Sequence, residues 1–108
     1  MNCAFFIIPM IIFHITTAIA WQTAQEKGEY VAESLATEGF IHTSRASQVQ
    51  PTLQRYFVGQ KDLVLLHIDT QCLTNSLRYD VATEGQYFPH VYGAINLSAV
   101  VKVETLFT

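Results

Sequence analysis

The chain has little of the positive charge that nucleic-acid binding requires. Among its 108 residues, 6 are Lys or Arg and 9 are Asp or Glu, so the formal net charge is -3, and no two basic residues are adjacent. Proteins bind duplex nucleic acid through clustered Lys and Arg side chains. We therefore expect no duplex nucleic-acid partner, although a site for one or two phosphates needs only a few hydrogen-bond donors.

Cysteine is also scarce. Cys3 and Cys72 lie far apart and match no C-x-x-C, zinc or haem spacing. Proteins of reducing compartments keep such thiols unpaired. The pattern predicts two free thiols and a cytoplasmic location.

Long apolar runs are missing as well. Residues 1–20 are mostly apolar, but a proline, a histidine and two threonines interrupt them, and a membrane span needs about 20 apolar residues. The stretch ends Ala18-Ile19-Ala20, which would suit signal-peptide cleavage, yet it has no Lys or Arg. We expect no membrane association. Residues 1–9 are interpreted as an extension or a mis-called start, and residues 10–108 as one domain.

Apolar residues are plentiful, at 50% of the chain, so a core can form without disulfide staples. Strand patterns cover residues 10–15, 40–42, 62–69, 76–81 and 100–107. A first helix is predicted over 17–27, from the N-cap Thr17 to Gly28. A second begins at Thr43 or Ser44, with a kink or a late start near Pro51.

This order of elements predicts an α+β fold with two early helices packed on a mainly antiparallel sheet. The segment 82–93 contains two glycines and a proline among aromatic residues, so we expect a loop there. The chain has no G-x-G-x-x-G and no G-x-x-x-x-G-K-[ST]. Neither of the standard dinucleotide or P-loop motifs is therefore present.

Three segments place a histidine beside hydroxyl or aromatic residues at the end of a predicted strand. They are His14-Ile15-Thr16-Thr17, Gly39-Phe40-Ile41-His42-Thr43-Ser44 and Phe88-Pro89-His90-Val91-Tyr92-Gly93. A single histidine at a strand end is more often structural than functional. Three of them in similar surroundings favour a shared site, and we expect His14, His42 and His90 to face one cavity.

These segments, with the strand Leu63-Val64-Leu65-Leu66-His67-Ile68-Asp69 between them, resemble the DUF952 family over residues 10–104. The resemblance implies an ADP-ribosyltransferase-like fold, a fold that also includes the RNA 2′-phosphotransferases, which are enzymes that use NAD. It implies NAD-binding roles for His14, Thr16, Ser44, His90 and Tyr92. It also implies catalytic roles for His42 and Asp80, with Glu84 as the second choice of carboxylate.

The leading hypothesis is therefore a nucleotide-binding domain that takes NAD and has ADP-ribosyl- or phosphotransferase-like chemistry. Cleavage of a glycosidic bond needs a carboxylate and hydrogen bonds to the sugar. The rival hypothesis is a non-catalytic module that binds a small ligand or a protein. A metal-dependent enzyme is third, because the histidines lack the close spacing typical of metal ligands, and we expect no metal. Nothing in the sequence indicates an oligomeric state.

Overall fold

The computed structural model describes residues 10–107, so the interpretation of residues 1–9 lies outside the described part. Helices and strands follow the order β1 (Ile11–Thr17), α1 (Ala18–Lys27), β2 (Glu29–Tyr30), α2 (Glu33–Glu38), β3 (Ile41–His42), α3 (Val49–Tyr56), β4 (Leu63–Asp69), β5 (Ser76–Val81), β6 (Tyr87–Tyr92), β7 (Ile95–Asn96) and β8 (Val100–Phe107). The predicted α+β class is confirmed.

The first strand and helix follow the sequence prediction closely. The Thr17 hydroxyl accepts a hydrogen bond from the Ala20 amide at 3.0 Å, which caps the first turn of α1. At the other end Gly28 adopts φ 92°, a left-handed conformation that suits glycine. Its backbone amide donates a hydrogen bond to the Ala24 carbonyl. The N-cap and the glycine stop were both visible in the sequence.

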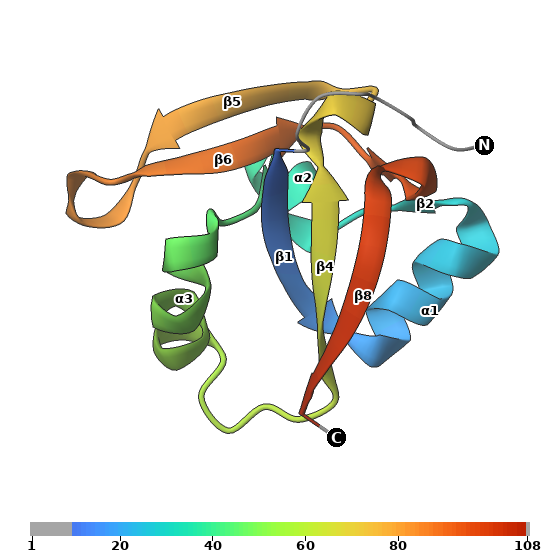
Figure 1. Ribbon diagram of the computed structural model, residues 1–108, viewed down its shortest axis with the longest axis horizontal. Coiled ribbons are helices and arrows are strands. Elements are labelled where there is room, and N and C mark those ends of the chain that lie inside the picture. Colours follow the sequence, from blue (N-terminus) through green and yellow to red (C-terminus); the bar gives the residue numbers. More distant parts are fainter. Residues whose placement is uncertain (1–9, 108) are drawn as a thin grey trace.

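Every strand pair is antiparallel in the described part of the chain. One sheet has the order β1-β4-β8, a second has the order β3-β6-β5, and β2 pairs with β7. Figure 1 shows β5 and β6 crossing one end of the first sheet. The two larger sheets are joined by a pair of backbone hydrogen bonds between Phe13 and Ser44, of 2.8 and 2.7 Å. This Phe13–Ser44 bridge positions the site described below.

Strands β1 and β4 are covered on both faces, whereas β8 is largely exposed. Ile12, Leu66 and Ile68 pack on the side of α1, where they join the larger core cluster. Ile15 and Leu65 point to the opposite face and pack against α3, and Figure 1 shows α1 and α3 on either side of the sheet. Since side chains alternate along a strand, a strand covered on both faces is apolar almost throughout, as β4 is.

Two expectations need correction. The segment 82–93 is not a loop throughout, because β6 occupies half of it. Pro89 lies opposite Thr43, at the position where β3 has ended. Its carbonyl still accepts from the Thr43 amide at 3.2 Å and from the Thr43 hydroxyl at 2.6 Å, so the proline gives up only the donor half of this pair. The six-residue α2 was also missed, since it has no side-chain cap and no buried residue.

The start of the second predicted helix is confirmed as late. A 3-10 turn covers Ala46–Gln48, and α3 begins at Val49. Pro51 is then the third residue of α3, within the first turn, where its missing amide hydrogen costs no helical bond.

The free-thiol prediction is wrong for Cys72, which is buried and disulfide-bonded. Cys3 lies outside the described residues. The cytoplasmic location loses that argument and stays a prediction. Within residues 10–107, no helix has the length and apolar character that crossing a membrane requires.

Candidate functional site

A pocket of about 420 Å³ opens beside the Phe13–Ser44 bridge. Strands β1, β3 and β6, helices α2 and α3, and the segments that follow them all contribute to its wall. The lining residues are Phe13, His14, Ile15, Ser34, Glu38, His42, Thr43, Ser44, Thr52, Tyr56, Phe57, Ala82, Phe88 and His90. The three histidines of the separate sequence segments thus line one cavity, which is called the histidine pocket below.

Two of the histidines are direct neighbours across the sheet. His42 of β3 and His90 of β6 are register partners, so their side chains emerge on the same face. Their ring centroids lie 5.3 Å apart in an edge-to-face arrangement. Phe40 stacks on the His90 ring at 4.0 Å with an interplanar angle of 16°, which fixes the plane of that imidazole.

His90 is further oriented by Asp80. The Nδ1 atom of His90 lies 2.9 Å from Oδ2 of Asp80, and the Tyr92 hydroxyl donates to the same oxygen at 2.5 Å. The Tyr92 and His90 hydrogen bonds lower the pKa of Asp80, so the carboxylate is charged at neutral pH and only accepts. His90 therefore carries a hydrogen on Nδ1, and in the neutral tautomer with that hydrogen Nε2 is the acceptor.

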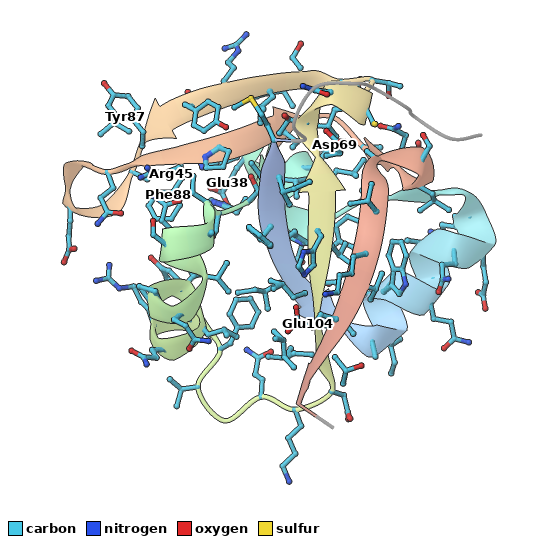
Figure 2. All side chains as sticks on the ribbon, in the orientation of Figure 1. Glu38, Arg45, Asp69, Tyr87, Phe88 and Glu104 are labelled. Atoms are coloured by element: carbon cyan, nitrogen blue, oxygen red, sulfur yellow. The ribbon has the colours of Figure 1, made fainter. Side chains whose placement is uncertain are left out.

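His42 is held by a different carboxylate. Its Nε2 atom lies 3.1 Å from Glu38 Oε2, and both side chains are about half exposed, at 54% and 49%. In Figure 2 the labelled Glu38 and Phe88 lie in the region between α3 and the β5–β6 hairpin. Sequence reasoning overlooked Glu38, although its i, i+4 spacing to His42 was readable. The aromatic lining residues Phe13, Tyr56 and Phe57 were overlooked as well.

His14 is the most constrained of the three. Only 8% of it is exposed, and Nδ1 donates to the His42 carbonyl at 2.6 Å. Nε2 lies 2.7 Å from the Tyr30 hydroxyl, whose oxygen lies 2.9 Å from Thr16 Oγ1. A phenol has one hydrogen, so if Tyr30 donates to His14 it accepts from Thr16. Burial, the largest effect, lowers the pKa of His14 to about 4, and the ring is uncharged at neutral pH.

The remaining predicted residues divide between the pocket and its surroundings. Ser44 lines the pocket and is 6% exposed. Thr16, Tyr92 and Asp80 do not line the pocket. Thr16 supports Tyr30, while Asp80 and Tyr92 act on the pocket through His90.

A second pocket of about 310 Å³ adjoins the first and shares Thr52, Tyr56 and Phe88 with it. It contains Arg55, the single Lys or Arg in either lining, whose Nη2 atom lies 3.3 Å from Glu84 Oε2. Glu84, the second choice of catalytic carboxylate, is therefore at this neighbouring pocket and paired with an arginine.

The described residues contain no group of three or more His, Cys, Asp or Glu side chains arranged to hold a metal ion. The histidines that line the pocket are instead engaged by hydrogen bonds to carboxylates, a carbonyl and a phenol. The expectation of no metal stays a prediction.

Comparison with known proteins gives a family and a fold. The family described as "Protein of unknown function (DUF952)" matches residues 15–103. The crystal structure of protein CC0527 from Caulobacter crescentus is 31% identical and has a TM-score of 0.81, covering 86% of this chain and 82% of that one. The solution structure of the same protein is 30% identical, with a TM-score of 0.79, and covers 91% and 85%. No curated protein matches the chain.

These descriptions state no activity. They support the α+β fold with its mainly antiparallel sheet. The likeness to ADP-ribosyltransferases stays a prediction.

Proposed function

The chain belongs to the DUF952 family, and from that premise we propose that it binds a small nucleotide of the NAD type in the histidine pocket. The observation that carries the proposal is the convergence of His14, His42, His90 and Ser44 from three distant segments on one pocket. A volume of about 420 Å³ lies within the range typical of small-ligand sites.

The pocket wall suits a flat ring with polar edges. Phe13, Tyr56, Phe57 and Phe88 supply aromatic surface, and aromatic side chains pack well against planar heterocycles. Ser44 also lines the pocket, and its hydroxyl can donate or accept a hydrogen bond with a ligand. A nucleobase or a nicotinamide ring presents both an apolar face and polar edge atoms.

The adjoining pocket indicates where the phosphates of a dinucleotide would lie. A dinucleotide is longer than one ring site and carries negative phosphates, which the histidine pocket has no Lys or Arg to bind. Arg55 lies in the adjoining pocket, beyond the shared residues Tyr56 and Phe88. We therefore orient the ligand with one ring among the histidines and its phosphates toward Arg55.

The proposal includes transferase-like chemistry at the sugar, with roles revised from the sequence. His90 is the group that would meet the ligand, through the Nε2 atom left as acceptor. Asp80 is a positioning residue, because it holds His90 and does not line the pocket. The rival, a non-catalytic module, shares the binding step and differs only in lacking turnover.

Thermal unfolding with NAD, ADP-ribose or a 2′-phosphorylated nucleotide tests the binding step. A ligand at 100 times its dissociation constant adds about 2.7 kcal/mol to the native state, which is on the order of 10 °C for a domain of this size. His42→Gln should remove most of that shift. His67→Gln is the matched control, because His67 also pairs with a glutamate but does not line the pocket.

The ligand-free midpoints of both variants should stay within a few degrees of the wild type. Absence of any shift with all three ligands at millimolar concentration would overturn nucleotide binding. Unfolding of the His42→Gln variant without ligand would instead show that His42 is a structural residue.

A further inference from the structure

The charges around the histidine pocket are one-sided. Glu38 is the single Asp, Glu, Lys or Arg among its lining residues. His14 is uncharged at neutral pH because burial disfavours the imidazolium. The environment that a ligand ring meets there therefore has a negative carboxylate at its edge and no positive side chain of Lys or Arg to oppose it.

No arginine lines the pocket, although Arg45 directly follows the lining residue Ser44 and is labelled near Glu38 and Phe88 in Figure 2. Arg55 belongs to the adjoining pocket and pairs with Glu84. The guanidinium of Arg78 lies 4.7 Å from the centre of the Tyr92 ring, on the side of Asp80 and outside the pocket lining. Asp80 itself adds a second negative charge behind His90, 2.9 Å from its Nδ1 atom.

The aromatic wall acts in the same direction. Phe13, Tyr56, Phe57 and Phe88 line the pocket, and the faces of aromatic rings attract cations within about 6 Å. A neutral ligand ring gains only packing against these aromatic side chains. A positively charged ligand ring gains the same packing, and it is also attracted by the faces of the aromatic side chains and by the Glu38 carboxylate.

We propose that the histidine pocket selects a positively charged ring, and that Glu38 is the specificity-determining residue. For the identity of that ring the inference rests on the proposed function, because the pyridinium of NAD is such a group. The ligand class is then an N-alkylated pyridinium or a similar heterocyclic cation, and a neutral ring of the same shape should bind less tightly.

A pair of fragments isolates the ring charge. 1-Methylnicotinamide is a cation and nicotinamide is neutral, and neither carries phosphate. Their dissociation constants are measured by titration calorimetry or by NMR at pH 8, where free imidazole is uncharged, and at low salt. We expect the cation to bind roughly three- to tenfold more tightly, a modest factor because Glu38 is 49% exposed and its field is screened by solvent.

Two variants separate Glu38 from general surface charge. Glu38→Gln should reduce the ratio of the two affinities to less than about twofold. Glu104→Gln should leave it unchanged, because Glu104 pairs with His67 at 3.0 Å and is 48% exposed, a close match for Glu38 and His42, yet it does not line the pocket. Figure 2 labels both glutamates and shows Glu104 toward the other end of the β1-β4-β8 sheet.

Equal binding of the two fragments, or tighter binding of nicotinamide, would overturn the inference, as would a Glu38→Gln variant that keeps the wild-type ratio. NAD and ADP-ribose are titrated in parallel. If both bind while the fragments show no preference, the charge selection fails and the proposed function stands. If the fragments are discriminated and neither nucleotide binds, the nucleotide proposal fails and the site for a cationic ring stands.

Discussion

At the scale of single residues, the buried His14 makes the stability of the fold depend on pH. Its pKa is lowered to about 4 in the native state, mainly by burial, whereas an unfolded chain has an imidazole pKa near 6.5. Below pH 6.5 the unfolded state takes up a proton that the native state refuses. Stability therefore falls as the pH drops from about 6.5 toward 4.

Linkage gives the expected size. Between pH 7.5 and pH 5 the His14 contribution should lower the free energy of unfolding by about 2 kcal/mol. Urea unfolding of wild type and His14→Gln at both pH values measures it, and the variant should lose about 2 kcal/mol less than the wild type. An equal loss in both proteins would contradict the assignment, whatever the absolute stability of the variant.

The Tyr30 hydroxyl should matter more to stability than the Tyr92 hydroxyl. Tyr30→Phe leaves the buried Nε2 atom of His14 without its donor, and an unsatisfied buried acceptor costs about 1–3 kcal/mol. Tyr92→Phe removes a bond to Asp80, which is partly exposed and can turn to water. Denaturant unfolding should rank Tyr30→Phe as the more destabilising change, and the reverse order would contradict the described network.

Prediction of single residues from the sequence succeeded for the three histidines and failed for Tyr30 and Glu38, which form hydrogen bonds with two of them. The three imidazoles were recognisable because each stands beside hydroxyl or aromatic residues in a short distinctive segment. Tyr30 was not, since a lone tyrosine carries no local pattern and its role depends on which strand the fold brings beside it. Glu38 was overlooked although it lies four residues before His42, because the two residues belong to different elements, α2 and β3.

At the scale of elements, the turn after β6 tolerates glycine alone. Gly93 has φ 151°, and a Cβ atom there would lie 2.5 Å from the Asn75 side chain. Asn75 cannot easily move, because its Nδ2 atom donates to the Ala94 carbonyl at 2.7 Å. This contact explains the glycine that ends the segment Phe88-Pro89-His90-Val91-Tyr92-Gly93.

Gly93→Ala should therefore be destabilising by more than backbone strain. Gly59 is the control, because it also has positive φ, at 77°, but a Cβ there would meet nothing within 4 Å. We expect Gly59→Ala to cost about 1 kcal/mol and Gly93→Ala about 1–3 kcal/mol more, from the overlap with Asn75. Equal thermal midpoints for the two variants would show that the Asn75 contact is unimportant.

Element prediction worked where local signals were strong. Thr17 and Gly28 marked the limits of α1, and the apolar run after Asp62 marked β4. It failed for β6, because the penalty for proline in a strand depends on the partner strand, and the short β3 ends before it reaches Pro89. Pairing between distant segments decides this, and the local sequence does not record it.

At the scale of the whole molecule, the two larger sheets should differ in local stability. β4 is buried along almost its whole length, whereas β5 lies at an edge and has no fully buried residue. Opening free energies span a wide range within one protein and fall where few apolar contacts are lost. Native-state hydrogen exchange should find β4 amides opening only with global unfolding and β5 amides opening at lower free energy. Equal protection of both strands would contradict this prediction.

The Phe13–Ser44 bridge has a mechanical consequence. Within residues 10–107, one pair of backbone hydrogen bonds joins β1 to the segment that follows β3, and the His14 side chain adds a bond to the His42 carbonyl. The histidine pocket has lining residues on both sides of this seam. A small rotation of one sheet relative to the other about the Phe13–Ser44 bridge would change the width of the pocket. A ligand in contact with both sides would act as a wedge that fixes the angle, and the amides of Phe13 and Ser44 would then exchange more slowly when the pocket is filled.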